Sequence, residues 1–248
     1  MNKDVYAIKL TELSLLLKIV FTLFIVMIGI AYLVSVLNLY LTYHLTDGKP
    51  GLSIDDLRRS FYGQRNRSLL AAKIDGGSME QFLPFPGEKE TILSWLQDGV
   101  TREGYENIKH IFEGRCVTCH TLDGLMSRRP LTMFEEVEEV TVVDRGEPIS
   151  LWARVAHVHL MSLAVIFLCL SVIFSFCGVG QKMKAFFMPL PFLALFLDFG
   201  ARALIKYVPS FVYVMAAAGA LMALSMMVLT LGPLYEMWIR GRKVSNEP

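Results

Sequence analysis

The sequence has few of the side chains that commonly bind metals, with four cysteines and five histidines among 248 residues. Cys169 and Cys177 lie in an apolar run long enough to cross a membrane, away from the pair Cys116 and Cys119. A structural zinc site needs four Cys or His ligands at short spacing, and too few of these residues lie near that pair. A thioredoxin-like C-x-x-C pair would need a βαβ pattern, which the sequence lacks. These shortages argue against a zinc centre and against a thioredoxin-like redox site.

Charged residues are also scarce, at 19% of the chain, and they are unevenly distributed. Residues 45–150 hold 18 of the 23 acidic residues but only 13 of the 24 basic ones, so this segment is net acidic. The other basic residues lie beside apolar runs, which argues against a nucleic-acid partner. The distribution predicts an acidic water-soluble domain joined to a membrane part with basic flanks.

Hydrophobic residues make up 54% of the chain, and four long apolar runs contain many of them. A helix needs about 20 such residues to cross about 30 Å of hydrocarbon. The first run is longer than the apolar core of a cleaved signal peptide, and no clear small-residue cleavage site follows it. We therefore expect the first run to be an uncleaved anchor and all four runs to contact the lipid bilayer. The runs are residues 19–43, 155–179, 185–207 and 211–231.

One motif carries specific chemistry, the run Cys116-Val117-Thr118-Cys119-His120. C-x-x-C-H is the attachment signature of c-type haem. Two thiols three positions apart on one turn can both reach the vinyl groups of a porphyrin, and His120 then follows as the proximal ligand of the iron. The sequence predicts one covalent haem c, with Cys116, Cys119 and His120 as cofactor-binding residues and His120 as a metal ligand.

Two independent arguments give the same orientation in the membrane. In bacteria, haem is attached to C-x-x-C-H outside the inner membrane, so residues 45–153 should be periplasmic. The positive-inside rule places short basic segments in the cytoplasm, and these segments flank the apolar runs on the opposite side. The chain is therefore predicted to be a multi-pass protein of the bacterial inner membrane with its haem domain in the periplasm. The basic residues concerned are Lys3, Lys9, Lys18, Lys182, Lys184, Arg240, Arg242 and Lys243.

The segment around the motif resembles a class I cytochrome c with its two halves in swapped order, as in a circular permutation. Gly76-Gly77-Ser78-Met79, a loop with Pro84 and Pro86, and a helical segment ending at Trp95 are similar to the methionine loop and closing helix of that family. Gly104-Tyr105 then opens a helix that leads into the motif. The resemblance covers roughly residues 76–125 and implies Met79 as the second iron ligand. Met126, Met133 or a histidine remain alternatives, and His110 is expected to be a surface residue.

These observations predict an all-α fold. Four transmembrane helices are expected, with a small helical periplasmic cytochrome c domain inserted between the first and the second. The predicted segments are an N-terminal membrane anchor helix (1–44), the periplasmic domain (45–153) and a three-helix transmembrane bundle (154–248). Within the periplasmic domain, helical pieces are expected at Ile54–Phe61, Glu88–Gln97 and Tyr105–Arg115.

Several polar residues fall inside the predicted spans. His157 and His159 open the second span but point about 200° apart on a helix, so one haem cannot easily take both. A haem b held by His44 with His157 or His159 is a weaker alternative. Asp198 and Arg202 share one face of the third span at i, i+4 spacing. With the histidines they could form a quinol site, or they could only fix the bundle by hydrogen bonds.

Taken together, the sequence resembles a membrane-anchored monohaem c-type cytochrome. The expected function is relay of single electrons between a membrane redox complex or the quinol pool and periplasmic redox proteins. Two alternatives remain open at this point. One is a haem-bearing subunit of a quinol-oxidising membrane oxidoreductase, and the other is a structural haem subunit of a larger membrane complex.

Overall fold

The computed structural model describes residues 9–85 and 87–240, and in this part of the chain the named elements are all helical. It contains four helices long and apolar enough to span a membrane. The predicted all-α class and the four spans are therefore confirmed. Lys3, Pro86, Arg242 and Lys243 lie outside the described residues.

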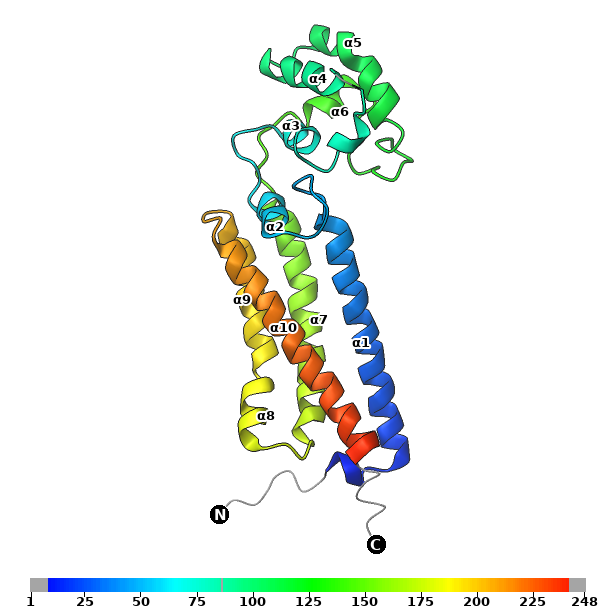
Figure 1. Cartoon of the computed structure of the whole chain (residues 1–248), viewed down its shortest axis with the longest axis vertical. Helices are drawn as coiled ribbons and strands as arrows, with labels where there is room; N and C mark the ends of the chain where they lie inside the picture. The colour runs from blue at the N-terminus through cyan, green and yellow to red at the C-terminus, as the bar shows by residue number, and fades with distance from the viewer. Residues whose placement is uncertain (1–8, 86, 241–248) are drawn as a thin grey trace. The chain divides into compact units, whose positions relative to one another are not determined.

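The chain forms two compact units, shown in Figure 1. The membrane unit combines the residues up to Leu39 with those from Ile149 onward, and the second unit is Tyr40–Pro148. The three-segment division at residues 44 and 153 stays a prediction.

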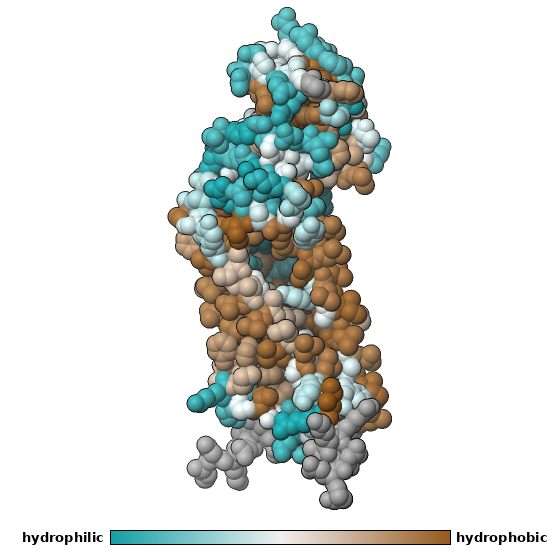
Figure 2. Space-filling model, in the orientation of Figure 1, coloured by the Kyte–Doolittle hydropathy of each residue, from teal (hydrophilic) through white to brown (hydrophobic). Residues whose placement is uncertain are grey.

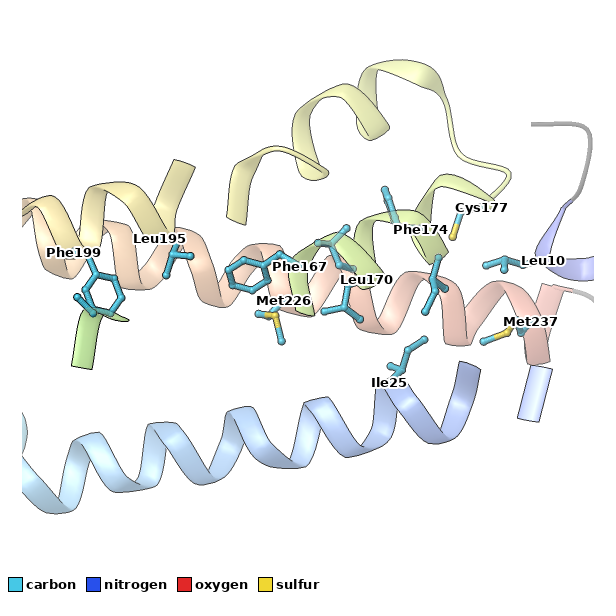
Figure 3. Close-up of a cluster of buried hydrophobic side chains, with 13 residues drawn as sticks. Leu10, Ile25, Phe167, Leu170, Phe174, Cys177, Leu195, Phe199, Met226 and Met237 are labelled. Atoms are coloured by element: carbon cyan, nitrogen blue, oxygen red, sulfur yellow. The ribbon is translucent and has the colours of Figure 1, made fainter. Parts of the chain in front are cut away.

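The membrane unit is a helix bundle whose apolar side chains face both its core and its surroundings. It comprises α1 (Leu15–Tyr43, continuing into the second unit), α7 (Ile149–Ser175), α8 (Gln181–Phe187), α9 (Leu190–Ile205) and α10 (Phe211–Tyr235), which a π-helical turn continues to Arg240. Phe167 of α7 lies beside Met226 of α10 in its core (Figure 3), and the Phe174 ring lies further along, against Gly232 of α10. Hydrophobic residues also cover most of the visible outer face of the bundle (Figure 2), as expected where lipid is the solvent.

The third predicted span is interrupted. Pro189 precedes α9 and Pro191 lies in its first turn, so α8 and α9 are separate helices. Proline lacks the amide hydrogen that continues a helical ladder, and its ring obstructs the preceding turn. The apolar run of residues 185–207 thus folds as the end of α8 followed by α9.

Polar residues at one end of the membrane unit are hydrogen-bonded. The Lys184 ammonium donates to the carbonyl of Ser175 at 2.6 Å, and the carboxylate of Glu236 accepts from the amide of Gly178 at 2.6 Å. The Trp238 indole donates to the Thr22 hydroxyl of α1 at 2.8 Å. These bonds tie together the start of α1, the end of α7 and the end of α10.

The second unit consists of short helices around a small aromatic core. Polar N-caps begin several of them: Ser53 accepts from the amide of Asp56 at the start of α2, and Thr101 accepts from the amide of Gly104 at the start of α5. Such caps satisfy amides that lack a partner in the first turn. The elements are α2 (Ile54–Phe61), α3 (Leu69–Ile74), α4 (Glu88–Gln97), α5 (Arg102–Ile111), a π-helical turn (Phe112–Cys116) and α6 (Phe134–Glu138), with a 3₁₀ turn at Glu80–Phe82.

Candidate cofactor site

The C-x-x-C-H residues share one turn of backbone in the second unit. The amides of Cys119 and His120 both donate to the carbonyl of Cys116, at 3.1 and 2.9 Å. This turn follows a π-helical turn that ends at Cys116, a kind of helix irregularity that is frequent at functional sites. Both cysteines are half-buried and form no disulfide. The structure thus brings the two thiols and the imidazole together on a single turn.

The imidazole of His120 is oriented by a backbone group. Its Nδ1 lies 2.7 Å from the carbonyl oxygen of Arg129. A carbonyl only accepts hydrogen bonds, so Nδ1 must donate, which leaves the lone pair of the neutral ring on Nε2. Metal-binding histidines are usually held in this way, with the distal ring nitrogen donating to a carbonyl or carboxylate. The Leu131 amide in turn donates to the His120 carbonyl at 2.9 Å, which fixes the same loop.

Sequence reasoning missed the role of Arg129. A backbone carbonyl has no side-chain signature, and its position depends on how residues 121–131 fold back onto the motif. The only available signal was the proline that follows, Pro130, because a residue before proline tends to be extended and its carbonyl then points away from a helical ladder.

The thiol of Cys116 is kept in its neutral form. Burial raises its pKa to about 11, and the nearby carboxylate of Glu88 acts in the same direction. Thiolate is the reactive form of cysteine, and the raised pKa keeps little of Cys116 in that form at neutral pH. Glu88 itself is bonded to the guanidinium of Arg115 at 3.1 Å, next to the motif.

Met79 lies half-buried against the same core as Cys116. The shared core contains Trp95, Tyr105 and Phe112, and the ring centroids of Tyr105 and Phe112 are 5.7 Å apart. The structure therefore brings the proposed iron ligand Met79 to the core that supports the motif, although the two are 37 positions apart in the sequence.

The alternative methionines occupy more open positions. Met126 is 49% exposed and Met133 is 51% exposed. Met126 nevertheless follows the motif closely, because its amide donates to the carbonyl of Cys119 at 2.9 Å. The assignment of Met79 as the second iron ligand stays a prediction, with Met126, Met133 or a histidine as alternatives. His110 is exposed on α5, as predicted.

Charged side chains hold the loop that carries Met79. A carboxylate oxygen of Glu80 accepts from the amide of Gly76 at 2.8 Å, and the other pairs with Lys89 at 2.8 Å. The hydrogen bond from Lys89 lowers the pKa of Glu80, and that from Arg67 lowers the pKa of Asp75. These pairs are largely exposed, so they contribute little to stability. Their main effect is to fix the loop geometry at neutral pH.

Gly77 makes the tightest contact in this loop and gives a prediction. A Cβ at Gly77 would lie 2.3 Å from the Ala72 carbonyl oxygen and 2.8 Å from that of Lys73, both backbone atoms. We expect Gly77→Ala to shift the Met79 loop and to destabilise the second unit by about 1–3 kcal/mol, as overpacking does. Urea unfolding of the full chain, followed by tryptophan fluorescence, to which Trp95 of this unit contributes, measures the loss.

Gly114 supplies the matched control. A Cβ there meets nothing within 4 Å, so Gly114→Ala should leave stability unchanged or raise it by up to about 1 kcal/mol through better helix propensity. Equal unfolding midpoints for the two variants would contradict the close approach at Gly77.

The donor set fits a covalently attached haem. One turn offers two free thiols and an imidazole with its lone pair on Nε2, and apolar side chains near the motif are exposed, including Leu122 and Leu125, the latter at 90%. Beside the Met79 loop, a cavity of about 260 Å³ is lined by Leu45, Gly48, Gly77, Ser78, Glu80 and Gln81. This cavity is smaller than ordinary ligand pockets of about 300–1,000 Å³, so a porphyrin would lie against the exposed apolar side chains instead.

Free metal ions need a different arrangement. Across residues 9–85 and 87–240, no group of three or more His, Cys, Asp or Glu side chains is placed to hold an ion. A haem iron needs only one or two axial side chains, so this finding concerns ions alone.

The three histidines near the predicted spans lie in different units of the chain. His44 lies in the second unit, where it stacks on Tyr40 at 4.6 Å between ring centroids and its Nδ1 contacts the Tyr40 carbonyl. His157 and His159 lie on α7 of the membrane unit. A haem b shared by His44 and one of them stays a prediction.

Comparison with known proteins supports the prediction that the chain spans a membrane. Residues 145–244 match a family model described as a transmembrane helical domain. This match covers α7 to α10 and leaves the C-x-x-C-H motif outside it. No curated protein and no solved structure matches the chain. Together with the four apolar helices, the match indicates a multi-pass membrane protein.

Proposed function

We propose that this protein is a membrane-anchored monohaem c-type cytochrome that relays single electrons. The observation that carries the proposal is the His120 imidazole, whose Nδ1 is engaged by the Arg129 carbonyl while two free thiols occupy the same turn. This combination supplies both the covalent attachment points and a correctly oriented iron ligand.

The residues take separate roles in this proposal. The thiols of Cys116 and Cys119 would each add across one vinyl group, sulfur bonding one carbon and the proton the other, so no external oxidant is consumed. His120 Nε2 and the Met79 sulfur would hold the iron. Bound haem would supply a one-electron Fe(III)/Fe(II) couple. Trp95, Tyr105 and Phe112 keep water away from the inner side of Cys116.

The proposed location is the bacterial inner membrane, with the second unit in the periplasm. Lys18, Lys184 and Arg240 belong to the end of the membrane unit where α1 starts and where α7 and α10 end, as the bonds from Leu10 to Phe176 and from Trp238 to Thr22 indicate. The positive-inside rule puts this end in the cytoplasm. Because α1 runs from that end to Tyr43, the segment that follows it emerges on the opposite side.

Periplasmic redox proteins with a basic surface are the proposed partners. The second unit is net acidic, and Glu135, Glu138 and Glu139 lie together and exposed around α6. Acidic surfaces steer oppositely charged partners and raise their association rates at low ionic strength.

The coordination number of the iron distinguishes an electron carrier from a haem protein that carries out catalysis or binds a gas. An electron carrier should have a six-coordinate, low-spin iron in both oxidation states. We therefore expect the purified full chain to bind carbon monoxide poorly and Met79→Ala to bind it readily, because the substitution opens a coordination position. Absorption spectra of the reduced proteins under carbon monoxide measure this difference.

Met133→Ala is the control, since Met133 is half-exposed, and it should behave like the parent chain. A parent chain that is high-spin and binds carbon monoxide as readily as Met79→Ala would contradict the electron-relay proposal. An open position in Met126→Ala rather than in Met79→Ala would overturn the assignment of Met79 alone.

A further inference from the structure

A cluster of ionisable and aromatic side chains lies within the membrane-spanning helices. It consists of Trp152 and His159 on α7 and of Asp198, Phe199 and Arg202 on α9. Ionisable residues at membrane depth are costly and usually mark sites for ions, protons or substrates. None of these five residues takes part in the proposed haem site.

The contacts within this cluster centre on Phe199. Its ring centroid lies 6.2 Å from that of His159, and the Arg202 guanidinium carbon lies 5.7 Å from the same ring. The Trp152 indole donates to the Phe199 carbonyl at 3.3 Å and so links α7 to α9 directly. Asp198 directly precedes Phe199 and stands four positions before Arg202 on α9, so its carboxylate shares a helix face with the guanidinium.

His159 is set up as a proton acceptor. Its Nδ1 lies 3.0 Å from the Val155 carbonyl of its own helix, so this nitrogen donates and Nε2 holds the lone pair. The side chain is exposed rather than packed in the bundle core. A histidine that only held two helices together would form hydrogen bonds to the neighbouring helix. Here the hydrogen bond between α7 and α9 is made by Trp152 instead.

The cluster can be approached from the lipid. Val158 and Met161, apolar neighbours of His159 on α7, are exposed like His159 itself, so this part of α7 is open to lipid.

We propose that this cluster binds a lipid-soluble quinol and oxidises it, an inference that rests on the proposed electron relay. The Asp198 carboxylate and His159 Nε2 would each accept one hydroxyl proton, while Arg202 offers hydrogen bonds to an oxygen. One quinol gives one quinone, two protons and two electrons. The electrons leave one at a time, so each quinol reduces two ferric c-type haems in succession.

The first test measures binding alone. The full chain in lipid nanodiscs is irradiated with a short-tailed azidoquinone, and the labelled peptides are identified by mass spectrometry. We expect labelling on α7 or α9 that excess unlabelled quinone suppresses, in the parent chain and equally in the haem-free full chain Cys116→Ala/Cys119→Ala. Labelling that is absent from both helices, or that quinone does not suppress, would overturn the proposed site.

The second test measures electron transfer. Asp198→Asn and His159→Gln should each slow haem reduction by a short-tailed quinol at least tenfold, within the range for loss of a general base. The control is Ser162→Ala, one turn further along α7, whose hydroxyl bonds only its own helix, and it should keep the parent rate. Two independent variants keep the test valid if one of them fails to fold.

The outcomes separate this inference from the proposed function. Parent-like rates in both Asp198→Asn and His159→Gln would overturn the quinol site while leaving the haem proposal intact. Suppressible labelling of a parent chain that itself proves to carry no haem would support quinol binding and refute the electron relay.

Discussion

His120→Ala is expected to leave haem attached to the chain and to remove its nitrogen ligand. The thioether bonds depend on Cys116 and Cys119, whereas axial ligation depends on the imidazole that Arg129 orients. The low-spin spectrum should therefore change to a high-spin or five-coordinate one. Added imidazole should restore a low-spin spectrum, because a free imidazole can enter the position left by the side chain. Absorption spectra with and without imidazole measure both effects.

His110→Ala provides the comparison for this variant. His110 lies exposed on α5, ten positions before His120, and its removal should leave the spectrum as in the parent chain. A low-spin spectrum that survives in His120→Ala without added imidazole would contradict the ligand assignment, since another side chain would then bind the iron.

Phe112→Ala is expected to destabilise the second unit by about 3–5 kcal/mol, the usual cost of removing a fully buried phenylalanine. The Phe112 side chain is 0% exposed. Its ring centroid lies 5.7 Å from that of Tyr105 and 6.5 Å from that of Trp95, so the cavity would open in the centre of the core. Thermal unfolding of the full chain, followed by near-ultraviolet circular dichroism, measures the change.

The same substitution should leave the membrane unit intact, because the two units have separate hydrophobic cores. Phe82→Ala is a suitable control, since Phe82 is 53% exposed and an exposed side chain usually contributes within about 0.5 kcal/mol. A loss in Phe112→Ala no larger than in Phe82→Ala would show that this aromatic core is not what stabilises the second unit.

Much of the helical structure could be predicted from the sequence because each signal is local. Apolar length alone identified α1, α7 and α10. The helices α2 and α4 have the predicted bounds, and the Ser53 cap marks the start of α2. The predicted helix from Tyr105 begins earlier, at Arg102, since Thr101 accepts from the Gly104 amide and caps it there.

The details that were missed lie where backbone hydrogen bonding departs from the regular pattern. The third span was predicted correctly and corresponds to Gln181–Ile205, but averaged hydropathy did not reveal the break between α8 and α9 near Pro189 and Pro191. The π-helical turns Phe112–Cys116 and Glu236–Arg240 have no propensity signature. Such turns add a residue to the helical ladder and depend on the tertiary packing around them.

In the candidate site, too, the local features could be predicted from the sequence and the features that depend on tertiary folding could not. The motif itself was evident, because its chemistry is contained in five consecutive residues. The Arg129 carbonyl and the shared core of Met79 and Cys116 depend on folding of segments distant in sequence. The His159, Asp198 and Arg202 cluster was anticipated from helical spacing, while the link through Trp152 to the Phe199 carbonyl required the structure.

Extraction of the purified full chain with acidified acetone, followed by a pyridine haemochrome spectrum, tests the central assignment. We expect the pigment to stay with the polypeptide and to amount to one haem per chain, of the type whose two vinyl groups are saturated by thioether bonds. Pigment that passes into the acetone, or a preparation from a c-type maturation host that contains no haem, would contradict the assignment of Cys116, Cys119 and His120.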